Sequence, residues 1–306
     1  MRSPLGHGST AGIGSKVGSE APGALTSFNP DVASGFPRTN RAIVRVPWSP
    51  LRRDPFHRSE MVSQLVLGEV VELREAPLSG WFRVRGPDGY EGATTAGSLR
   101  QVSDDDAAAW IAAADGFSLG TALLGPGAPA GFAPWGARLP RASRGGFLVP
   151  DGDRVEAAET EKILFGPERA LSCPGDPEAA AETARAWMGA PYHWGGRIPE
   201  GADCSGFVQS VFWLHGFRLP RDSRDQRSAA AALPEDLDPA SEGRPGDVWF
   251  FAWDGKPVSH VGICLGDGQM IHASETRGGV AIDRWNEGTF GRRLAEGFAA
   301  AVRPER

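Results

Sequence analysis

A cysteine at the start of an expected helix constrains this chain more than any other feature. Residues 201–209, Gly-Ala-Asp-Cys-Ser-Gly-Phe-Val-Gln, are followed by apolar residues at helical spacing as far as Leu214, and Gly216 supplies a stop. Asp203 is a favourable N-cap residue, so Cys204 should lie in the first turn. The amide dipoles there favour the thiolate, which is the form of cysteine that attacks carbonyl carbons. The pattern therefore predicts a nucleophilic cysteine.

Two histidines downstream supply the base that a nucleophilic cysteine needs. His260 lies in Ser-His-Val-Gly-Ile-Cys-Leu and His272 in Met-Ile-His-Ala-Ser, and both segments have strand character. The turn-forming residues 266–268, Gly-Asp-Gly, separate them, so a hairpin would bring both rings to one sheet edge. Strand alternation places His260 on the same face as Gly262 and Cys264, and we expect this face of small residues to leave room for the thiolate.

The order of these motifs resembles that of the NlpC/P60 family of bacterial cell-wall cysteine peptidases. Asp-Cys-Ser-Gly-Phe, His-Val-Gly-Ile and Ile-His-Ala-Ser follow one another in the family's order, with Pro-Tyr-His-Trp-Gly-Gly upstream and Arg-Pro-Gly-Asp-Val between them. The resemblance covers residues 177–306 and implies a papain-like α+β fold. It further implies that Cys204 attacks the substrate, His260 transfers the proton and His272 orients His260. The alternatives are a buried structural cysteine and ordinary core histidines.

Six further residues match positions at which members of that family contact a peptide. Tyr192 and Trp194 would form a wall of the substrate groove, and the tyrosine could donate to the oxyanion. The backbone amide of Cys204 is a second expected donor, because a helix N-terminus has free N–H groups. By position, the residues that would hold the peptide stem are Asp203, Ser205, Asp222 and Ser223. Helix capping and packing are the alternative roles for these side chains.

Upstream, short strands separated by turns predict a small β-barrel over residues 41–103. Its motifs, Leu-Arg-Arg, Val-x-x-Leu-x-x-Gly-Glu, Gly-Trp-Phe-x-Val and Asp-Gly-Tyr-x-Gly, resemble bacterial SH3-like domains. In relatives that recycle murein peptides, an acidic residue and a tyrosine of this domain hold the free amine of L-Ala, together with the aspartate before the nucleophile. The matching residues here are Glu60, or alternatively Glu69, and Tyr90. A barrel without a ligand role is the other interpretation.

The remaining segments complete the predicted organisation. Residues 1–40 are rich in Gly, Ser, Ala and Pro, which indicates a flexible or loosely packed arm. A linker helix and a second SH3-like barrel are expected over residues 104–165, and a linker that contains Cys173 over 163–177. Within the peptidase-like domain, residues 224–232 should form a helix. His215 should lie on a helix surface and His193 on a loop, as these rings stand outside the motif positions.

Composition argues against several other functions. The net charge of −6 disfavours binding to nucleic acid or to an anionic membrane surface. No apolar run reaches the roughly 18 residues that a membrane-spanning helix needs. Three cysteines and the lack of a signal-peptide pattern favour the cytoplasm, if Met1 is the native start. A zinc site of Cys204, His260 and His272 is disfavoured, because no Cys-x-x-Cys or His-x-x-x-His pair occurs.

The resemblance as a whole implies a cysteine endopeptidase of cell-wall peptide recycling. Its expected partner is L-Ala-γ-D-Glu-diamino acid, of which it would hydrolyse the γ-D-glutamyl bond to diaminopimelate or lysine without a cofactor. One alternative is an exported hydrolase that cuts stem peptides in the intact wall. Another is a non-catalytic wall-binding SH3-like protein, and a third is an acyltransferase or amidase built on the same fold.

Overall fold

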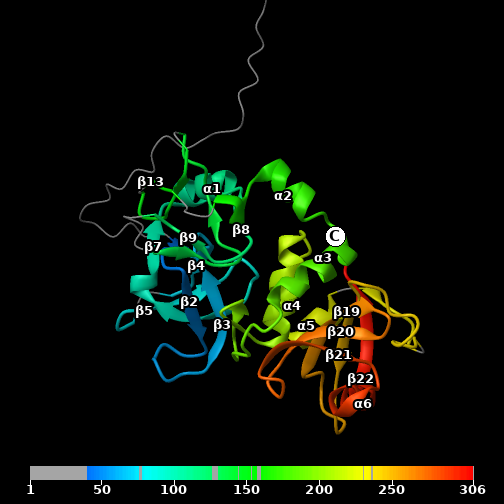
Figure 1. The fold of residues 1–306 in the computed structure, drawn as a ribbon. Coiled ribbons are helices and arrows are strands. Elements are labelled where there is room, and N and C mark those ends of the chain that lie inside the picture. The colour runs from blue at the N-terminus through cyan, green and yellow to red at the C-terminus, as the bar shows by residue number, and fades with distance from the viewer. Residues whose placement is uncertain are drawn as a thin grey trace, which may run out of the picture.

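A computed structural model describes the protein at residues 40–75, 78–125, 130–143, 145–152, 154–156, 160–229, 231–235 and 237–305. Apart from Asn40, the predicted arm lies outside these residues. A β-rich N-terminal part and an α+β C-terminal part lie side by side, and helices α2 (Gly166–Ser172) and α3 (Pro177–Ala184) run between them (Figure 1). No helix in the described ranges combines the length and the apolar character that crossing a membrane requires.

The first β region, residues 41–102, is one antiparallel sheet in the order β3-β2-β6-β5-β4-β1-β7. Alternating aliphatic and aromatic residues such as Val44, Leu65 and Phe82 form its core. The second strand has little sequence signal because it contains Pro50, which lacks the N–H donor of a ladder residue. The strands are β1 (Arg41–Val44), β2 (Trp48–Arg52), β3 (Met61–Val66), β4 (Val70–Leu73), β5 (Trp81–Arg85), β6 (Glu91–Thr95) and β7 (Leu99–Val102).

Between the first β region and the C-terminal part, the chain forms one ten-residue helix and several strands of two or three residues. Helix α1 (Asp104–Ala113) begins as predicted, with the hydroxyl of Ser103 accepting from the amide of Asp106. The strands are β8 (Gly116–Ser118), β9 (Ala122–Leu123), β10 (Phe132–Ala133), β11 (Arg138–Leu139), β12 (Phe147–Leu148), β13 (Arg154–Val155) and β14 (Ile163–Leu164). The linker expected over 163–177 is wrong, because β14 pairs with β8 and α2 follows. The second SH3-like barrel stays a prediction.

The C-terminal part is built on an antiparallel sheet in the order β17-β22-β18-β19-β20-β21. The α+β prediction is confirmed, since helices precede most of these strands. A two-residue pair, β15 (Arg197–Ile198) with β16 (Gly201–Ala202), leads into α4 (Cys204–Leu214). The sheet strands are β17 (Ala231–Ala232), β18 (Val248–Phe251), β19 (His260–Gly266), β20 (Gln269–Ser274), β21 (Gly279–Arg284) and β22 (Phe298–Arg303).

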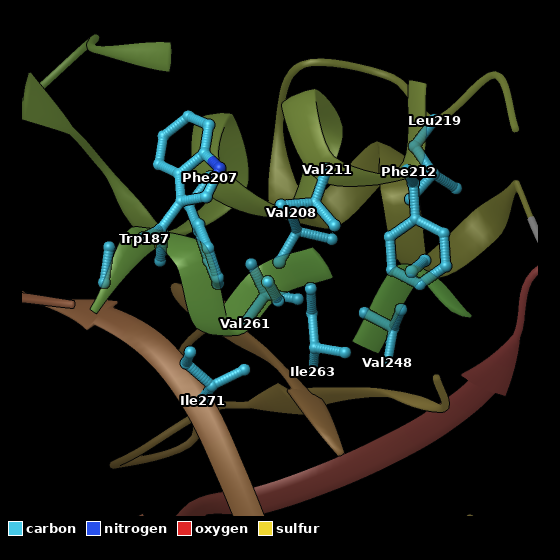
Figure 2. Packing of buried hydrophobic residues seen from close by; sticks show 14 of the residues in the cluster. Trp187, Phe207, Val208, Val211, Phe212, Leu219, Val248, Val261, Ile263 and Ile271 are labelled. Atoms are coloured by element: carbon cyan, nitrogen blue, oxygen red, sulfur yellow. The ribbon is translucent and has the colours of Figure 1, made fainter. Parts of the chain in front are cut away.

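Helix α4 occupies the centre of the main apolar cluster, and every one of its residues is buried. An apolar surface on all sides is the pattern of a core helix. Figure 2 shows its side chains packed against the sheet, with Phe207, Val208, Val211 and Phe212 facing Val248, Val261, Ile263 and Ile271. Helix and sheet therefore fix the first residue of α4 relative to the histidine hairpin.

Three local predictions need correction. Helix α5 (Ser223–Ser228) ends before residue 232, because Ala231 and Ala232 pair with β22 instead. Helix α6 (Gly288–Gly297) was not foreseen, since its glycines break the helical pattern. His215 is buried rather than on a helix surface, and its ring contacts the carbonyl of Pro174 at 2.7 Å and the hydroxyl of Thr183 at 2.9 Å.

Candidate active site

The predicted nucleophile is the first residue of α4 and lies at the base of a cleft. The Asp203 N-cap is confirmed, because its Oδ1 accepts from the amide of Gly206 at 2.7 Å. The Cys204 side chain is almost fully buried and lines two adjoining hollows, so its thiol meets the cleft and not bulk solvent. A substrate carbonyl must therefore enter the cleft to reach the sulfur.

The two histidines are brought together as the hairpin prediction requires. Strands β19 and β20 pair antiparallel, and Nε2 of His260 lies 2.6 Å from Nδ1 of His272. Both rings line the hollow that also contains Cys204. The hairpin is confirmed, and the catalytic roles of the two rings stay predictions.

A buried carboxylate that sequence reasoning missed continues this hydrogen-bonded chain. Oδ2 of Asp283 lies 2.9 Å from Nε2 of His272, and its Oδ1 is 3.1 Å from a guanidinium nitrogen of Arg277. The signal for it was available in the strand alternation, because Ala281 pairs with His272 and residue 283 lies on the same face.

The carboxylate fixes the tautomers of both rings. Ionised Asp283 can only accept, so Nε2 of His272 donates to it and the neutral ring presents a bare Nδ1. His260 then donates its Nε2–H to that atom, which leaves Nδ1 of His260 as its basic nitrogen. The hydrogen-bonded chain from Asp283 through His272 thus assigns one proton acceptor, Nδ1 of His260, to the cleft.

The expected approach of the thiol along the small-residue face of β19 is wrong. A Cβ at Gly262 would lie 2.6 Å from the sulfur of Met270 and 3.0 Å from Cβ of His272, so the glycine permits close packing of β20. Cys264 belongs to the apolar cluster on that face. Cys204 belongs instead to the cluster that contains Val261, on the opposite face of the strand.

Burial opposes the charged forms of both reacting groups. It raises the pKa of the Cys204 thiol to about 12, with a further contribution from the neighbouring carboxylate of Asp203. Burial also lowers the pKa of His260 well below 6.5, and His272 and Arg293 add to this shift. Desolvation thus acts against the helix dipole and favours a neutral thiol beside a neutral imidazole, the reverse of the expected thiolate.

The cleft extends to both sides of Cys204. A hollow of about 210 Å³ includes the histidines and Tyr192, and one of about 450 Å³ reaches the first β region. Both are lined by Trp194, Cys204 and Ser259, so one continuous groove passes over the sulfur. Among the described residues, no set of three or more His, Cys, Asp or Glu side chains converges as a metal site.

Asp203 is already engaged within the chain. Oδ2 lies 2.6 Å from Nη2 of Arg221 and accepts from the amide of Gly195 at 2.8 Å, while Oδ1 accepts from Nη1 of Arg221 at 3.0 Å. Arg221 also donates to the hydroxyl of Ser63 in β3 at 3.1 Å. With the helix cap added, this carboxylate has little free accepting capacity, so its predicted contact with a substrate amine is not supported by the geometry.

The first β region closes the larger hollow with the two predicted residues. Oε1 of Glu60 accepts from the indole of Trp194 at 2.8 Å, and the Tyr90 hydroxyl donates to Oδ2 of Asp222 at 3.1 Å. All four side chains line the hollow. Glu69, the alternative to Glu60, is buried elsewhere and paired with Arg197 at 2.7 Å. The geometry therefore favours Glu60, and Asp222 supplies a second carboxylate next to Tyr90.

The other predicted binding residues divide between the two hollows. Tyr192 lies beside Cys204, and burial raises the pKa of its hydroxyl, which stays a proton donor. Ser205 and Ser223 line the larger hollow, and the Ser205 hydroxyl accepts from Nη1 of Arg221 at 2.9 Å. Every predicted site residue thus borders the groove, and their roles stay predictions.

Two family profiles match this chain. The NlpC/P60 family matches residues 189–298, which include the nucleophile helix and the histidine hairpin. The bacterial dipeptidyl-peptidase Sh3 domain matches residues 51–92, which include Glu60 and Tyr90. The two profiles therefore cover both walls of the groove.

Curated relatives share the C-terminal match. A gamma-D-glutamyl-L-lysine dipeptidyl-peptidase of Bacillus subtilis is 38% identical over 110 residues, which are 35% of this chain and 36% of the relative. A probable endopeptidase p60 of Listeria innocua is 40% identical over 111 residues, which are 36% of this chain and 22% of the relative. The chain thus spans about a third or less of the length of these two relatives.

A solved structure shares the fold over a much longer range. The crystal structure of an NlpC/P60 family protein from Bacillus cereus superposes with a TM-score of 0.72 and covers 86% of this chain and 99% of that one. The sequence identity is 21%, so the likeness shows a common fold only. It extends over the first β region as well as the C-terminal part.

Proposed function

This chain carries an NlpC/P60 domain behind a bacterial SH3-like domain, and we propose that it is a cysteine peptidase of murein peptides. The bond cleaved is the γ-D-glutamyl bond to a diamino acid, in peptides with a free N-terminal L-Ala. One observation carries the proposal. Cys204 shares a cleft with His260, whose basic nitrogen is assigned through His272 by Asp283.

Because the Cys204 thiol and the His260 imidazole are both neutral in this proposal, the thiol loses its proton as it attacks. As the sulfur of Cys204 bonds to the γ-carbonyl carbon, Nδ1 of His260 takes the thiol proton. The amide of Cys204 and the hydroxyl of Tyr192 would donate to the oxyanion in this proposal. His260 then gives its proton to the leaving amine of the diamino acid. Water attacks the thioester with His260 again as base, and L-Ala-D-Glu leaves with restoration of the thiol.

The larger hollow supports a substrate with a free ammonium group. Glu60 and Asp222 bring carboxylates to the end of the groove that the first β region closes, where burial raises the pKa of Asp222. Glu60 already pairs with Arg53 at 2.6 Å, so the partly buried carboxylate of Asp222 is the charge that an ammonium group would chiefly compensate. A glycan attached to the alanine nitrogen would abolish that charge and meet the closing wall. The Bacillus subtilis relative, a gamma-D-glutamyl-L-lysine dipeptidyl-peptidase, supports the choice of bond.

Product analysis tests the proposal directly. The full chain is incubated with L-Ala-γ-D-Glu-diaminopimelate, and mass spectrometry is expected to detect L-Ala-D-Glu and free diaminopimelate. Cys204→Ala should abolish product while the circular dichroism spectrum is kept. Cys173→Ser is the matched control, since that thiol lies outside the cleft, and it should retain turnover. Turnover by Cys204→Ala would overturn the assignment.

The same assay separates the remaining alternatives. Release of stem peptides from intact sacculi would favour an exported wall hydrolase, and a product in which L-Ala-γ-D-Glu is joined to another acceptor in place of the released diamino acid would favour an acyltransferase. Binding to sacculi without any product would favour a wall-binding protein. Recycling of free peptides places the enzyme, in our proposal, in the cytoplasm. Fractionation of cells that express the chain from its genomic reading frame tests this location.

A further inference from the structure

A separate hollow lies where the first β region, α1 and the C-terminal part meet. It encloses about 160 Å³ and is lined by residues 68–70 between β3 and β4, by Trp110 and Ile111 of α1, and by Arg138 and Arg218. None of its lining residues borders the groove at Cys204. Arg218 follows the far end of α4, about 16 Å along the helix from its first residue. This hollow is therefore distinct from the candidate active site.

The two arginines of the hollow have no acidic partner within ion-pair distance among the described residues. Arg218 lies over the ring of Trp213 with 5.0 Å between the guanidinium carbon and the ring centroid, and Arg138 lies 5.8 Å from the ring centroid of Phe117. Glu69 borders the same hollow, but Arg197 and the amide of Val66 occupy its oxygens. Both arginines therefore line the hollow, and neither forms an ion pair within the described part of the chain.

The surrounding charges make this arrangement costly when the hollow is empty. Burial lowers the pKa of Arg138 to about 10, Glu69 opposes this shift, and Arg218, Arg169 and Arg197 contribute to it. Burial, together with Arg218, also lowers the pKa of Arg169. An anion beside Arg138 and the exposed Arg218 would offset the burial of the Arg138 charge and the repulsion between the two like charges.

We propose that this hollow binds a small doubly charged oxyanion, a phosphate group, between Arg138 and Arg218. A guanidinium group presents two parallel donors that match the oxygens of phosphate. The hollow is smaller than the roughly 300 Å³ at which pockets for drug-sized ligands begin, so the ligand is small. The Arg138 amide donates to the carbonyl of Leu67 at 3.0 Å, so the anion would join the first β region to the C-terminal part.

Calorimetric titration of the full chain with inorganic phosphate at constant ionic strength tests the site. Saturable binding with one anion per chain is expected. Arg218→Gln should weaken it at least tenfold, because one of the two charged donors is lost. Arg218 is exposed, so this variant should fold. Arg292→Gln in α6 is the matched control, since it removes an exposed arginine outside the hollow, and it should bind phosphate as the unmodified chain does.

Two further measurements distinguish a built site from a general basic surface. Acetate at the same ionic strength should bind at least tenfold more weakly than phosphate, because one negative charge cannot match two guanidinium groups. Phosphate should also raise the Tm of the unmodified chain and of Arg292→Gln, and leave that of Arg218→Gln unchanged. Non-saturable binding, equal weakening in both variants, or acetate binding as tight as phosphate would overturn the proposal.

Discussion

At the scale of single residues, the candidate site depends on a carboxylate that lies behind both histidine rings. Asp283 is buried and its two oxygens have different partners, His272 on one side and Arg277 on the other. A carboxylate only accepts hydrogen bonds, so Asp283 fixes the direction of the hydrogen bond from His272. Asp283 therefore determines which nitrogen of His260 carries the proton, through two successive hydrogen bonds.

Asp283→Asn should reduce kcat without a matching change in KM. The asparagine amide can donate to Nε2 of His272, which reverses the proton pattern and places a hydrogen on Nδ1 of His260. We expect kcat to fall by a factor on the order of 10² to 10⁴, as for a triad whose orienting aspartate becomes asparagine. Steady-state kinetics measure the split, and Asp283→Glu should recover part of the rate. The control Asp267→Asn, in the exposed turn after β19, should leave kcat unchanged. If Asp283→Asn also kept the kcat of the unmodified chain, the positioning role would be refuted.

The pH dependence should reflect a neutral resting pair. Because the pKa of His260 is lowered well below 6.5, the base stays unprotonated at pH 6.5. The acid limb of the kcat/KM profile should therefore lie at pH values below 6.5. Because the pKa of the Cys204 thiol is raised to about 12, iodoacetamide should alkylate it more slowly than a free thiol at pH 7. Its alkylation rate should continue to rise above pH 9. Fast alkylation with a plateau below pH 8 would instead show a thiolate–imidazolium pair.

At the scale of elements, the N-terminus of α4 is held by a buried ion pair as well as by its cap. Arg221 is 1% exposed and joins the Asp203 cap to Ser63 of β3. The same contact therefore sets the helix start, the nucleophile and the neighbouring sheet. Removing one member of such a pair leaves the other charge buried without compensation.

Arg221→Met should lower the free energy of unfolding by about 3–5 kcal/mol, because it leaves the Asp203 carboxylate buried and unpaired. Urea denaturation monitored by tryptophan fluorescence measures the change. Arg284→Met is the matched control, since Arg284 pairs with Glu287 at the surface, and it should cost about 1 kcal/mol or less. A loss below 1 kcal/mol for Arg221→Met would show that the pair is not a determinant of stability.

Elements with strong local patterns were predictable, and those that depend on distant partners were not. The α4 helix and the histidine hairpin follow from cap chemistry, apolar spacing and a Gly-Asp-Gly turn, all of which are local. Strand β17 and the end of α5 depend on pairing with β22, about seventy residues later. Asp283 could be placed on the right face by alternation, but its contact with His272 needs the β20–β21 register. The pKa shift of Cys204 was missed because burial is a property of the packed core.

At the scale of the whole molecule, the first β region and the C-terminal part form one groove. The backbone and side chain of Arg197 bind Gln64 of β3, and Gln209 of α4 donates to Asp88 at 3.2 Å. Glu60 and Tyr90 reach the groove from the same sheet. The first β region is therefore one wall of the groove and not a separate tether.

This arrangement predicts strong selection for a free alanine amine. N-acetylation of the tripeptide should lower kcat/KM about a hundredfold or more, because it removes a charge that Glu60 and Asp222 would contact and adds bulk at the closed end. Tyr90→Phe and Glu60→Gln should reduce the ratio of kcat/KM between the free and the acetylated tripeptide, since each removes a polar group that would help to bind the amine. Glu72→Gln is the matched control on the same sheet, since Glu72 pairs with Arg74 at the surface, and it should keep the full ratio of the two kcat/KM values. Competition assays with both peptides in one reaction measure the ratio of kcat/KM directly. Equal cleavage of the two peptides by the unmodified chain would contradict amine recognition while leaving the cysteine chemistry intact.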